Sequence, residues 1–176
     1  MNDFIKRAST FAIIAHEACG QVRKFTGEPY WWHLDRVASR VQSLGCDAET
    51  VAAAWLHDTL EDTFIKPFLI SSHFTTHTRI MVEQLTNDKS LQRKERKADE
   101  CERFKFAYPE TQTVKLADIL DNGYCFLRSG AHEATKTFML EKQELLKSLD
   151  LGHPKLYEEA KQMIDNYTLE RSTFYV

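Results

Sequence analysis

Hydrophobic residues recur at helical spacing along almost the whole chain. Apolar side chains repeat every three to four residues from Phe4 to Ala15, and again from Leu34 to Leu44. Glycine and proline are scarce, with six and four residues, and no strand pattern extends beyond a few positions. The pattern predicts an all-α fold, a bundle of about eight to ten helices.

Turn-forming residues predict where the first helices begin and end. The first helix should end near Gly20, and residues 21–30 read as a loop. Pro29 suits the first turn of a second helix, which stays periodic to about Gly45. Asp47 is then placed to cap the N-terminus of the next helix.

The remaining chain predicts further helices, which we place at residues 66–72, 75–86, 91–106, from Pro109 onward, 131–148 and 154–174. The segment 91–106 is strongly charged, which is typical of a solvated helix face. The last two helices are amphipathic, so we expect them to cover the rest of the fold. We predict one domain over residues 1–176, with covering helices within 131–174.

Composition narrows the class of protein. A chain of 176 residues with 43% hydrophobic and 28% charged residues can bury one core. A net charge of -3 does not favour nucleic acid as a partner, so an anionic ligand needs a local basic cluster. The sequence has no secretory signal pattern and no long apolar run, so we expect no membrane span and a cytoplasmic location. No pattern specifies an oligomeric state.

The four cysteines are far apart in the sequence. Cys19, Cys46, Cys101 and Cys125 form no C-x-x-C pair, so they do not indicate a zinc knuckle. We expect free thiols in a reducing compartment.

One apolar segment ends in four ionisable side chains. After Ala52-Ala53-Ala54-Trp55-Leu56 come His57, Asp58, Glu61 and Asp62. Buried without partners, such groups would cost several kcal/mol, on the order of 2–7 each. If one helix continues through them, His57 and Glu61 share a face with Asp58 and Asp62, which suits a divalent cation and an activated water.

Two other polar residues interrupt apolar helix faces. His33 directly precedes the stripe that begins at Leu34, and Asp118 lies inside an apolar segment after Pro109. With His57 and Asp58 they form a set of two imidazoles and two carboxylates from three helices. Such a set neutralises a divalent ion and leaves positions for water and a phosphate oxygen.

The order H…HD…D resembles the HD-domain metal-dependent phosphohydrolases, and more specifically the hydrolase domain of the RelA/SpoT homologues and the small alarmone hydrolases. The resemblance lies within residues 8–125. Its motifs are Ala15-His16, Gln21-x-Arg23-Lys24, Gly27-Glu28-Pro29-Tyr30-x-x-His33, Val37-Ala38, Ala54-x-Leu56-His57-Asp58-Thr59-x-Glu61-Asp62-Thr63, Thr86-x-Asp88-Lys89 and Val114-Lys115-x-Ala117-Asp118-x-x-x-Asn122.

The resemblance implies an all-helical HD domain, a single Mn2+ ion, and removal of pyrophosphate from the ribose 3′ position of guanosine tetra- or pentaphosphate. It implies four metal ligands, His33, His57, Asp58 and Asp118. Glu61 and Asp62 would orient or deprotonate the attacking water, and which of them is the base stays open.

The resemblance also assigns substrate contacts. Arg23 and Lys24 would hold phosphate, and Asn122 would line the cavity near the ribose or base. Lys89 would add positive charge, with Arg93 and Lys115 as further candidates for the same role. On residue chemistry alone, Lys115 reads as a side chain that extends along apolar surface to reach water.

Departures from the family pattern leave alternatives open. Trp31-Trp32 are bulkier than usual before His33 and could reshape the base pocket, because aromatic faces stack on bases. The substrate could then be another 3′-phosphorylated nucleotide or an RNA 3′ end, with the protein as an antitoxin. A third reading is a non-catalytic regulatory module. Because no synthetase-like segment follows, we expect degradation of the nucleotide without synthesis.

Overall fold

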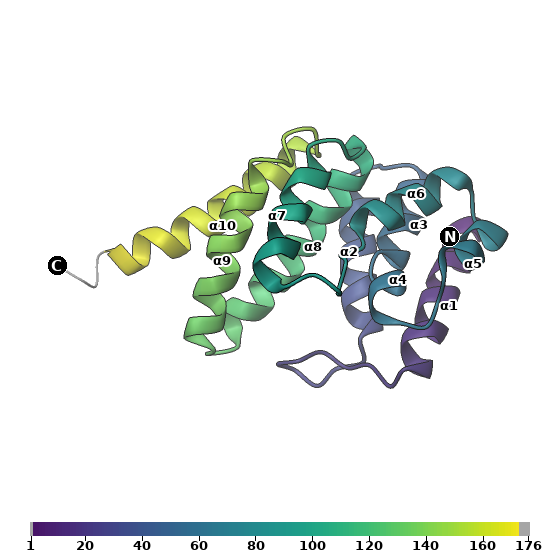
Figure 1. Ribbon diagram of the computed structural model, residues 1–176, viewed down its shortest axis with the longest axis horizontal. Helices are drawn as coiled ribbons and strands as arrows, with labels where there is room; N and C mark the ends of the chain where they lie inside the picture. The colour runs from purple at the N-terminus through teal and green to yellow at the C-terminus, as the bar shows by residue number, and fades with distance from the viewer. Residues whose placement is uncertain (1, 173–176) are drawn as a thin grey trace.

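The computed structural model describes residues 2–172 and is built from helices (Figure 1). Their bounds are α1 Asp3–Ala18, α2 Trp31–Ser43, α3 Ala48–Leu56, α4 Thr59–Asp62, α5 Pro67–His73, α6 Thr76–Leu85, α7 Arg93–Phe104, α8 Pro109–Arg128, α9 His132–Leu146 and α10 Pro154–Ser172. In the described chain the β-pairing is one isolated bridge between Val22 and Pro29. The all-α class is confirmed. Positions 173 and 174 of the last predicted helix lie outside the described residues.

Helix α3 lies at the centre of the N-terminal half. It contacts α1, α2, α6 and α8, and its residues from Thr50 to Leu56 are all buried. Three successive alanines, Ala52 to Ala54, allow the neighbouring helices to pack closely around it. The predicted cap is confirmed, because Asp47 Oδ1 accepts a hydrogen bond of 2.8 Å from the Thr50 backbone N–H.

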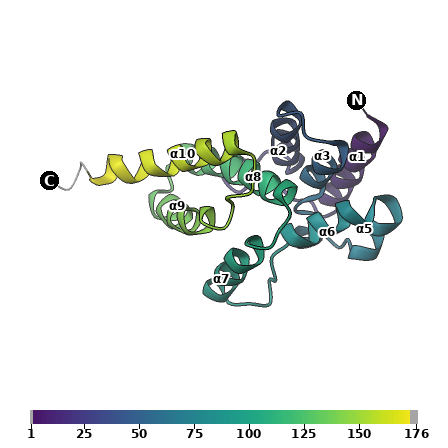
Figure 2. The same ribbon diagram turned by 90° about the horizontal axis from the view of Figure 1, so that it is seen from above.

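Helix α8 connects the two halves of the molecule. It contacts α2, α3 and α6 on one side and α9 and α10 on the other, while α7 lies beside α9 (Figures 1 and 2). Every residue from Thr111 to Leu120 is buried. Lys115 and Asp118 are therefore in the interior, and each needs a partner of opposite charge.

Two details of the predicted helices are wrong. Pro29 does not begin the second helix, because it pairs with Val22 and α2 begins only at Trp31. One helix does not continue through the acidic segment, since α3 ends at Leu56 and α4 begins at Thr59. The His57 imidazole explains the break: its Nδ1 bonds the Ala54 carbonyl at 2.7 Å, the carbonyl that the residue 58 N–H would use in a continuing helix.

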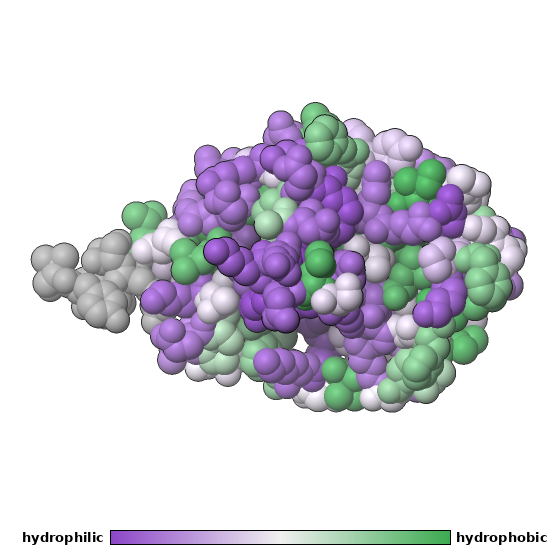
Figure 3. Space-filling model, in the orientation of Figure 1, coloured by the Kyte–Doolittle hydropathy of each residue, from purple (hydrophilic) through white to green (hydrophobic). Residues whose placement is uncertain are grey.

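No helix in the described part of the chain is long and apolar enough to cross a membrane. The four cysteines are free and half-buried. In Figure 3, hydrophilic side chains gather over the part of this face that α7 and α9 occupy.

We expect Asp47→Ala to lower the free energy of unfolding by about 1 kcal/mol, because it leaves an N-terminal N–H of α3 without its acceptor. Chemical denaturation followed by circular dichroism measures this loss. Asp150→Ala, which removes an exposed carboxylate from the turn after α9, is the matched control. Equal losses in the two variants would contradict a capping role.

Candidate metal centre

Two imidazole nitrogens and two carboxylate oxygens converge between α2, the break after α3, and α8. His33 Nε2 lies 3.2 Å from His57 Nε2, which lies 3.0 Å from Asp58 Oδ2. Asp118 Oδ1 lies 3.3 Å from His33 Nε2 and 3.8 Å from His57 Nε2. The structure therefore brings together the four residues that the sequence singled out as candidate ligands.

The donor set fits a divalent cation. Donor atoms held about 2.1 Å from an ion are about 3.0 Å apart at a right angle and about 3.4 Å apart in a tetrahedron, close to the separations in this cluster. His57 Nδ1 is used by the Ala54 carbonyl, and His33 Nδ1 lies 2.6 Å from Asp121 Oδ2. Each Nε2 is then free to present a lone pair to the other, and two such lone pairs repel unless a cation lies between them.

Electrostatics point to the same need for positive charge. Burial opposes the charged form of His33, but hydrogen bonds to Asp118, Asp121 and Asp58 raise its pKa to about 10. Burial likewise opposes the charged form of His57, yet the Asp58 carboxylate leaves its pKa above the ordinary value. In the absence of a metal ion, protons on the imidazoles compensate the carboxylates.

A second layer of side chains holds the candidate ligands in place. Tyr30 donates its hydroxyl to Asp58 Oδ2 at 2.6 Å, and Lys115 donates to Asp118 Oδ2 at 3.0 Å. Arg36 Nε donates to Asp121 Oδ1 at 2.6 Å, which fixes the partner of His33. Sequence reasoning assigned no role to Tyr30 or Asp121. Asp121 has no sequence signal beyond its position about one turn after Asp118 on α8.

Glu61 and Asp62 lie beside the cluster with different partners. Glu61 Oε2 accepts from the backbone and side-chain N–H groups of Asn87 at 2.9 and 3.1 Å. Burial and the neighbouring Asp58 raise the pKa of Glu61. Asp62 is engaged on both oxygens, because Oδ2 accepts from Gln21 at 2.9 Å and Oδ1 is paired with Lys89.

The cluster opens onto a cavity of about 560 Å³ between α4, α7, α8 and α9. Glu61, Asp118 and Asn122 line it on the side of the cluster. The cationic side chains that line it are Lys89, Arg93, Arg96, Lys97 and Lys142. Burial lowers the pKa of Lys142 to about 8, although Glu100 opposes this shift. These five cationic side chains, which we call the cationic wall, supply the local basic cluster that an anionic ligand needs in a chain of net charge -3.

A second cavity, of about 320 Å³, adjoins the first and shares Asn122 and Phe126 with it. Arg23 is buried there and donates to Asn122 Oδ1 at 2.9 Å. Lys24 is exposed and lines the same cavity.

The two tryptophans stack on each other, with ring centroids 4.6 Å apart. Neither indole lines either of the two cavities that adjoin the cluster.

Lys115 does not extend to water as its chemistry alone suggested. Its ammonium lies 3.0 Å from Asp118 Oδ2 and 3.1 Å from Glu100 Oε1, and the side chain is buried. Lys97 also pairs with Glu100, at 2.7 Å, and Lys142 lies 3.7 Å from it. The charged segment that forms α7 therefore contributes a buried carboxylate as well as a solvated face.

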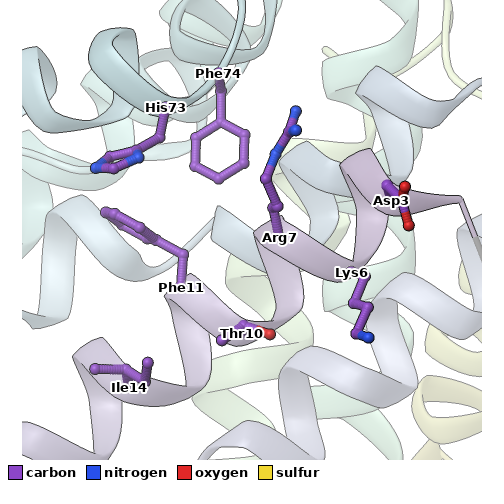
Figure 4. Close-up of a pocket in the computed structure, with 8 residues that line it drawn as sticks. All are labelled: Asp3, Lys6, Arg7, Thr10, Phe11, Ile14, His73 and Phe74. Carbon is purple, nitrogen blue, oxygen red and sulfur yellow. The ribbon is translucent and has the colours of Figure 1, made fainter.

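Another cavity, of about 530 Å³, lies between α1 and α5. Figure 4 shows the rings of Phe11, His73 and Phe74 beside one another, with Arg7 nearby. Among the described residues that line it, Asp3 is the only carboxylate and His73 the only imidazole, so these residues do not form the donor set of a metal centre.

We expect Lys115→Met to lower the free energy of unfolding by about 3 kcal/mol, because it leaves buried Glu100 and Asp118 without a shared cation. Urea denaturation measures the change. Lys147→Met, which breaks the exposed pair with Glu144 at the same i, i+3 spacing, should change stability far less. A loss at Lys115 no larger than at Lys147 would show that the buried pair contributes nothing.

The chain is similar in sequence to known proteins. The family model described as HD domain matches residues 8–145. A mouse protein named guanosine-3′,5′-bis(diphosphate) 3′-pyrophosphohydrolase MESH1 is 31% identical over 166 residues, covering 90% of this chain and 91% of that one. An Aquifex aeolicus protein named guanosine-3′,5′-bis(diphosphate) 3′-pyrophosphohydrolase is 38% identical over 121 residues, covering 67% of this chain and 17% of that one.

The fold of the chain is also similar to the folds of proteins with solved structures. A structure of a metazoan SpoT orthologue, described as hydrolysing ppGpp, superposes with a TM-score of 0.88 at 22% identity, covering 95% of this chain and 97% of that one. A Listeria monocytogenes protein superposes with a TM-score of 0.65 at 26% identity, covering 80% and 96% of the two chains. Both coverage and sequence identity place this chain in the HD domain family.

Proposed function

We propose that this protein is a Mn2+-dependent hydrolase that removes pyrophosphate from the ribose 3′ position of guanosine tetra- or pentaphosphate. The observation that carries the proposal is the convergence of His33, His57, Asp58 and Asp118 at the edge of a cavity with a cationic wall. Similarity to the mouse pyrophosphohydrolase over nearly the full length of both chains supports it. Because the four cysteines are free thiols, we also propose that the protein acts in the reducing cytoplasm.

In this proposal His33, His57, Asp58 and Asp118 hold one Mn2+ ion. Two nitrogen and two oxygen donors match a cation that accepts both kinds of ligand, and the two carboxylates balance its charge. A bound divalent ion supplies a Lewis acid that polarises a phosphoryl oxygen and lowers the pKa of water.

The cationic wall would hold the substrate's phosphates. Lys89 and Arg93 extend into the large cavity from the chain before α8, where they can neutralise charge on the 3′ diphosphate. Arg23 and Lys24 line the adjoining cavity and would hold a further phosphate. Asn122 lines both cavities, so we place the ribose beside it, with the base near Phe25 and Phe126, which line the adjoining cavity.

We assign Glu61 as the proton acceptor. It lines the cavity, its pKa is raised, and its two bonds from Asn87 reach Oε2 and leave Oε1 available. The attacking water gives its oxygen to the phosphorus and one proton to Glu61. The bond from phosphorus to the ribose 3′ oxygen breaks and pyrophosphate leaves. The 3′ oxygen takes a proton from solvent, and Glu61 releases to solvent the proton that it accepted. Asp62 would orient the water.

The structure gives no support to the alternative substrates, another 3′-phosphorylated nucleotide or an RNA 3′ end. They were suggested by Trp31 and Trp32, whose rings stack on each other and line neither adjoining cavity. A purely regulatory module has no need for Glu61 and Asp62 beside a complete donor set.

We expect the Mn2+-loaded protein to convert guanosine tetraphosphate to guanosine 5′-diphosphate and pyrophosphate. Glu61→Gln should lower kcat by about 100-fold or more while Mn2+ stays bound, because it removes only the proton acceptor. Glu158→Gln on the exposed face of α10 is the matched control and should retain full activity. Chromatography of the nucleotides and a pyrophosphate assay provide the measurement.

A folded, Mn2+-loaded wild type that releases no pyrophosphate would count against the proposed function. A panel with other 3′-phosphorylated nucleotides belongs in the same experiment. A clear preference for one of those nucleotides would contradict guanosine tetra- or pentaphosphate as the substrate, but it would be consistent with metal-dependent hydrolysis.

We expect the apparent affinity for Mn2+ to fall as the pH falls. The pKa of His33 without metal is about 10, so at neutral pH the ion must displace a proton, and affinity should drop about tenfold per pH unit for each proton displaced. Calorimetry in buffers of different ionisation enthalpy measures the protons released. His77→Ala on α6 should keep the same slope, and a pH-independent affinity would contradict the ligand assignment of His33.

A further inference from the structure

His16 lies near the end of α1, beside the candidate metal centre, and has no role in the mechanism above. Its side chain is buried, and its ring stacks on Tyr30 with centroids 4.9 Å apart and planes inclined by 14°. Tyr30 in turn donates to Asp58. His16 therefore packs against a residue that holds a candidate ligand, yet its own polar atoms face elsewhere.

Those polar atoms begin a chain of hydrogen bonds that ends at Asp62. His16 Nδ1 lies 2.6 Å from Gln21 Oε1, and Gln21 Nε2 donates to Asp62 Oδ2 at 2.9 Å. An amide nitrogen only donates and an amide oxygen only accepts. Since Gln21 uses its NH2 group on a carboxylate, its oxygen must accept, and His16 Nδ1 must carry the hydrogen.

The other nitrogen of His16 agrees with this assignment. His16 Nε2 is buried and has no hydrogen-bond partner among the described residues. A hydrogen on that nitrogen would be a buried donor without an acceptor, which is unfavourable. Burial also lowers the pKa of His16, which favours the neutral ring, and the hydrogen bond to Gln21 places its hydrogen on Nδ1.

Gln21 is held by the backbone as well as by its side chain. Its N–H donates to the His16 carbonyl at 3.2 Å, and its carbonyl accepts from the Tyr30 N–H at 3.2 Å. Lys89, the other partner of Asp62, differs in kind, because its side chain is 53% exposed and lines the cavity with the cationic wall. Asp62 thus has one fixed partner and one that a phosphate can draw away.

We infer that His16 and Gln21 are positioning residues that hold Asp62 Oδ2 while Lys89 exchanges Asp62 Oδ1 for a substrate phosphate. Oδ1 then becomes available to accept a hydrogen of the attacking water, and the carboxylate does not rotate when Lys89 leaves. This inference rests on the proposed function. Without His16, the Gln21 amide can turn and release Asp62 in the state in which substrate is bound.

A matched pair of variants at residue 16 separates the hydrogen bond from packing. His16→Asn and His16→Leu both remove the stacked ring, but an asparagine amide nitrogen can take the place of Nδ1 and donate to Gln21. We expect His16→Leu to lower kcat about 30-fold with KM and bound Mn2+ unchanged, and His16→Asn to stay within about threefold of wild type. Equal losses in the two variants would overturn the inference.

A double-variant cycle tests whether His16 acts through Asp62. In an Asp62→Ala background there is no carboxylate to hold, so His16→Leu should add less than about a threefold loss. The same 30-fold penalty in both backgrounds would show that His16 acts by another route and would overturn the inference.

A readout that needs no activity distinguishes this inference from the proposed function. In protein with 15N-labelled histidines and diamagnetic Mg2+, the His16 imidazole should show the neutral tautomer with hydrogen on Nδ1. In Gln21→Met, which keeps the side-chain length and removes the amide, that hydrogen should exchange faster with water. The tautomer with hydrogen on Nε2 would overturn the inference, whichever nucleotide the protein hydrolyses.

Discussion

The hydrogen bond between His57 Nδ1 and the Ala54 carbonyl is the interaction on which the candidate site depends. It takes the acceptor that α3 would need in order to continue, so the helix ends at Leu56 and the chain turns. The same bond places the hydrogen of the ring on Nδ1 and directs Nε2 at His33. Because the chain restarts as α4, Glu61 reaches Asn87 instead of lying directly above His57. One contact thus sets the tautomer, the turn and the direction of the acidic pair.

Keeping several carboxylates close together is the main electrostatic cost of this site. Asp58, Asp118 and Asp121 lie around His33, and each would repel the others without compensation. The fold compensates them locally: Lys115 pairs with Asp118, and Arg36 pairs with Asp121. In the proposed function a divalent ion between the imidazoles would supply the charge that remains, and without it protons on the imidazoles compensate the carboxylates. The formal charge of the whole chain gives no hint of this arrangement.

Sequence periodicity predicted the longer helices well because most of them pack against α3 or α8, as α1, α2, α6, α9 and α10 do. The cap at Asp47 was also predictable, because the two residues that form its hydrogen bond are only three positions apart in the sequence. The errors lie where contacts between segments override a local pattern. Pro29 is drawn into a bridge with Val22, and Lys115 meets Glu100 from another helix. Neither partner can be inferred from the neighbouring sequence.

The candidate ligands were suggested by residue type and by the order of motifs along the chain, and spacing alone could not have placed them. His33 and Asp118 are separated by about half of the chain and meet because α2 and α8 pack together. Their supporting residues were harder to find, because a tyrosine or an aspartate that holds a ligand has no distinctive local pattern. Tyr30 and Asp121 acquire meaning only from the atoms they contact.

Three carboxylates at the site share one arrangement. Asp118 directs Oδ1 at His33 while Lys115 binds its Oδ2, Glu61 has Oε2 bound by Asn87, and Asp62 has Oδ2 bound by Gln21. In each case a donor fixes one oxygen, from the same helix for Asp118 and from another segment for Glu61 and Asp62. In the proposed mechanism the other oxygen would face the ion, the water or an exchangeable lysine. A carboxylate held in this way cannot rotate as charge develops during the reaction, so the cost of orienting it is met during folding. In the proposed mechanism the residues that bind these carboxylates, Lys115, Asn87 and Gln21, therefore matter as much as the candidate ligands and the acidic pair themselves.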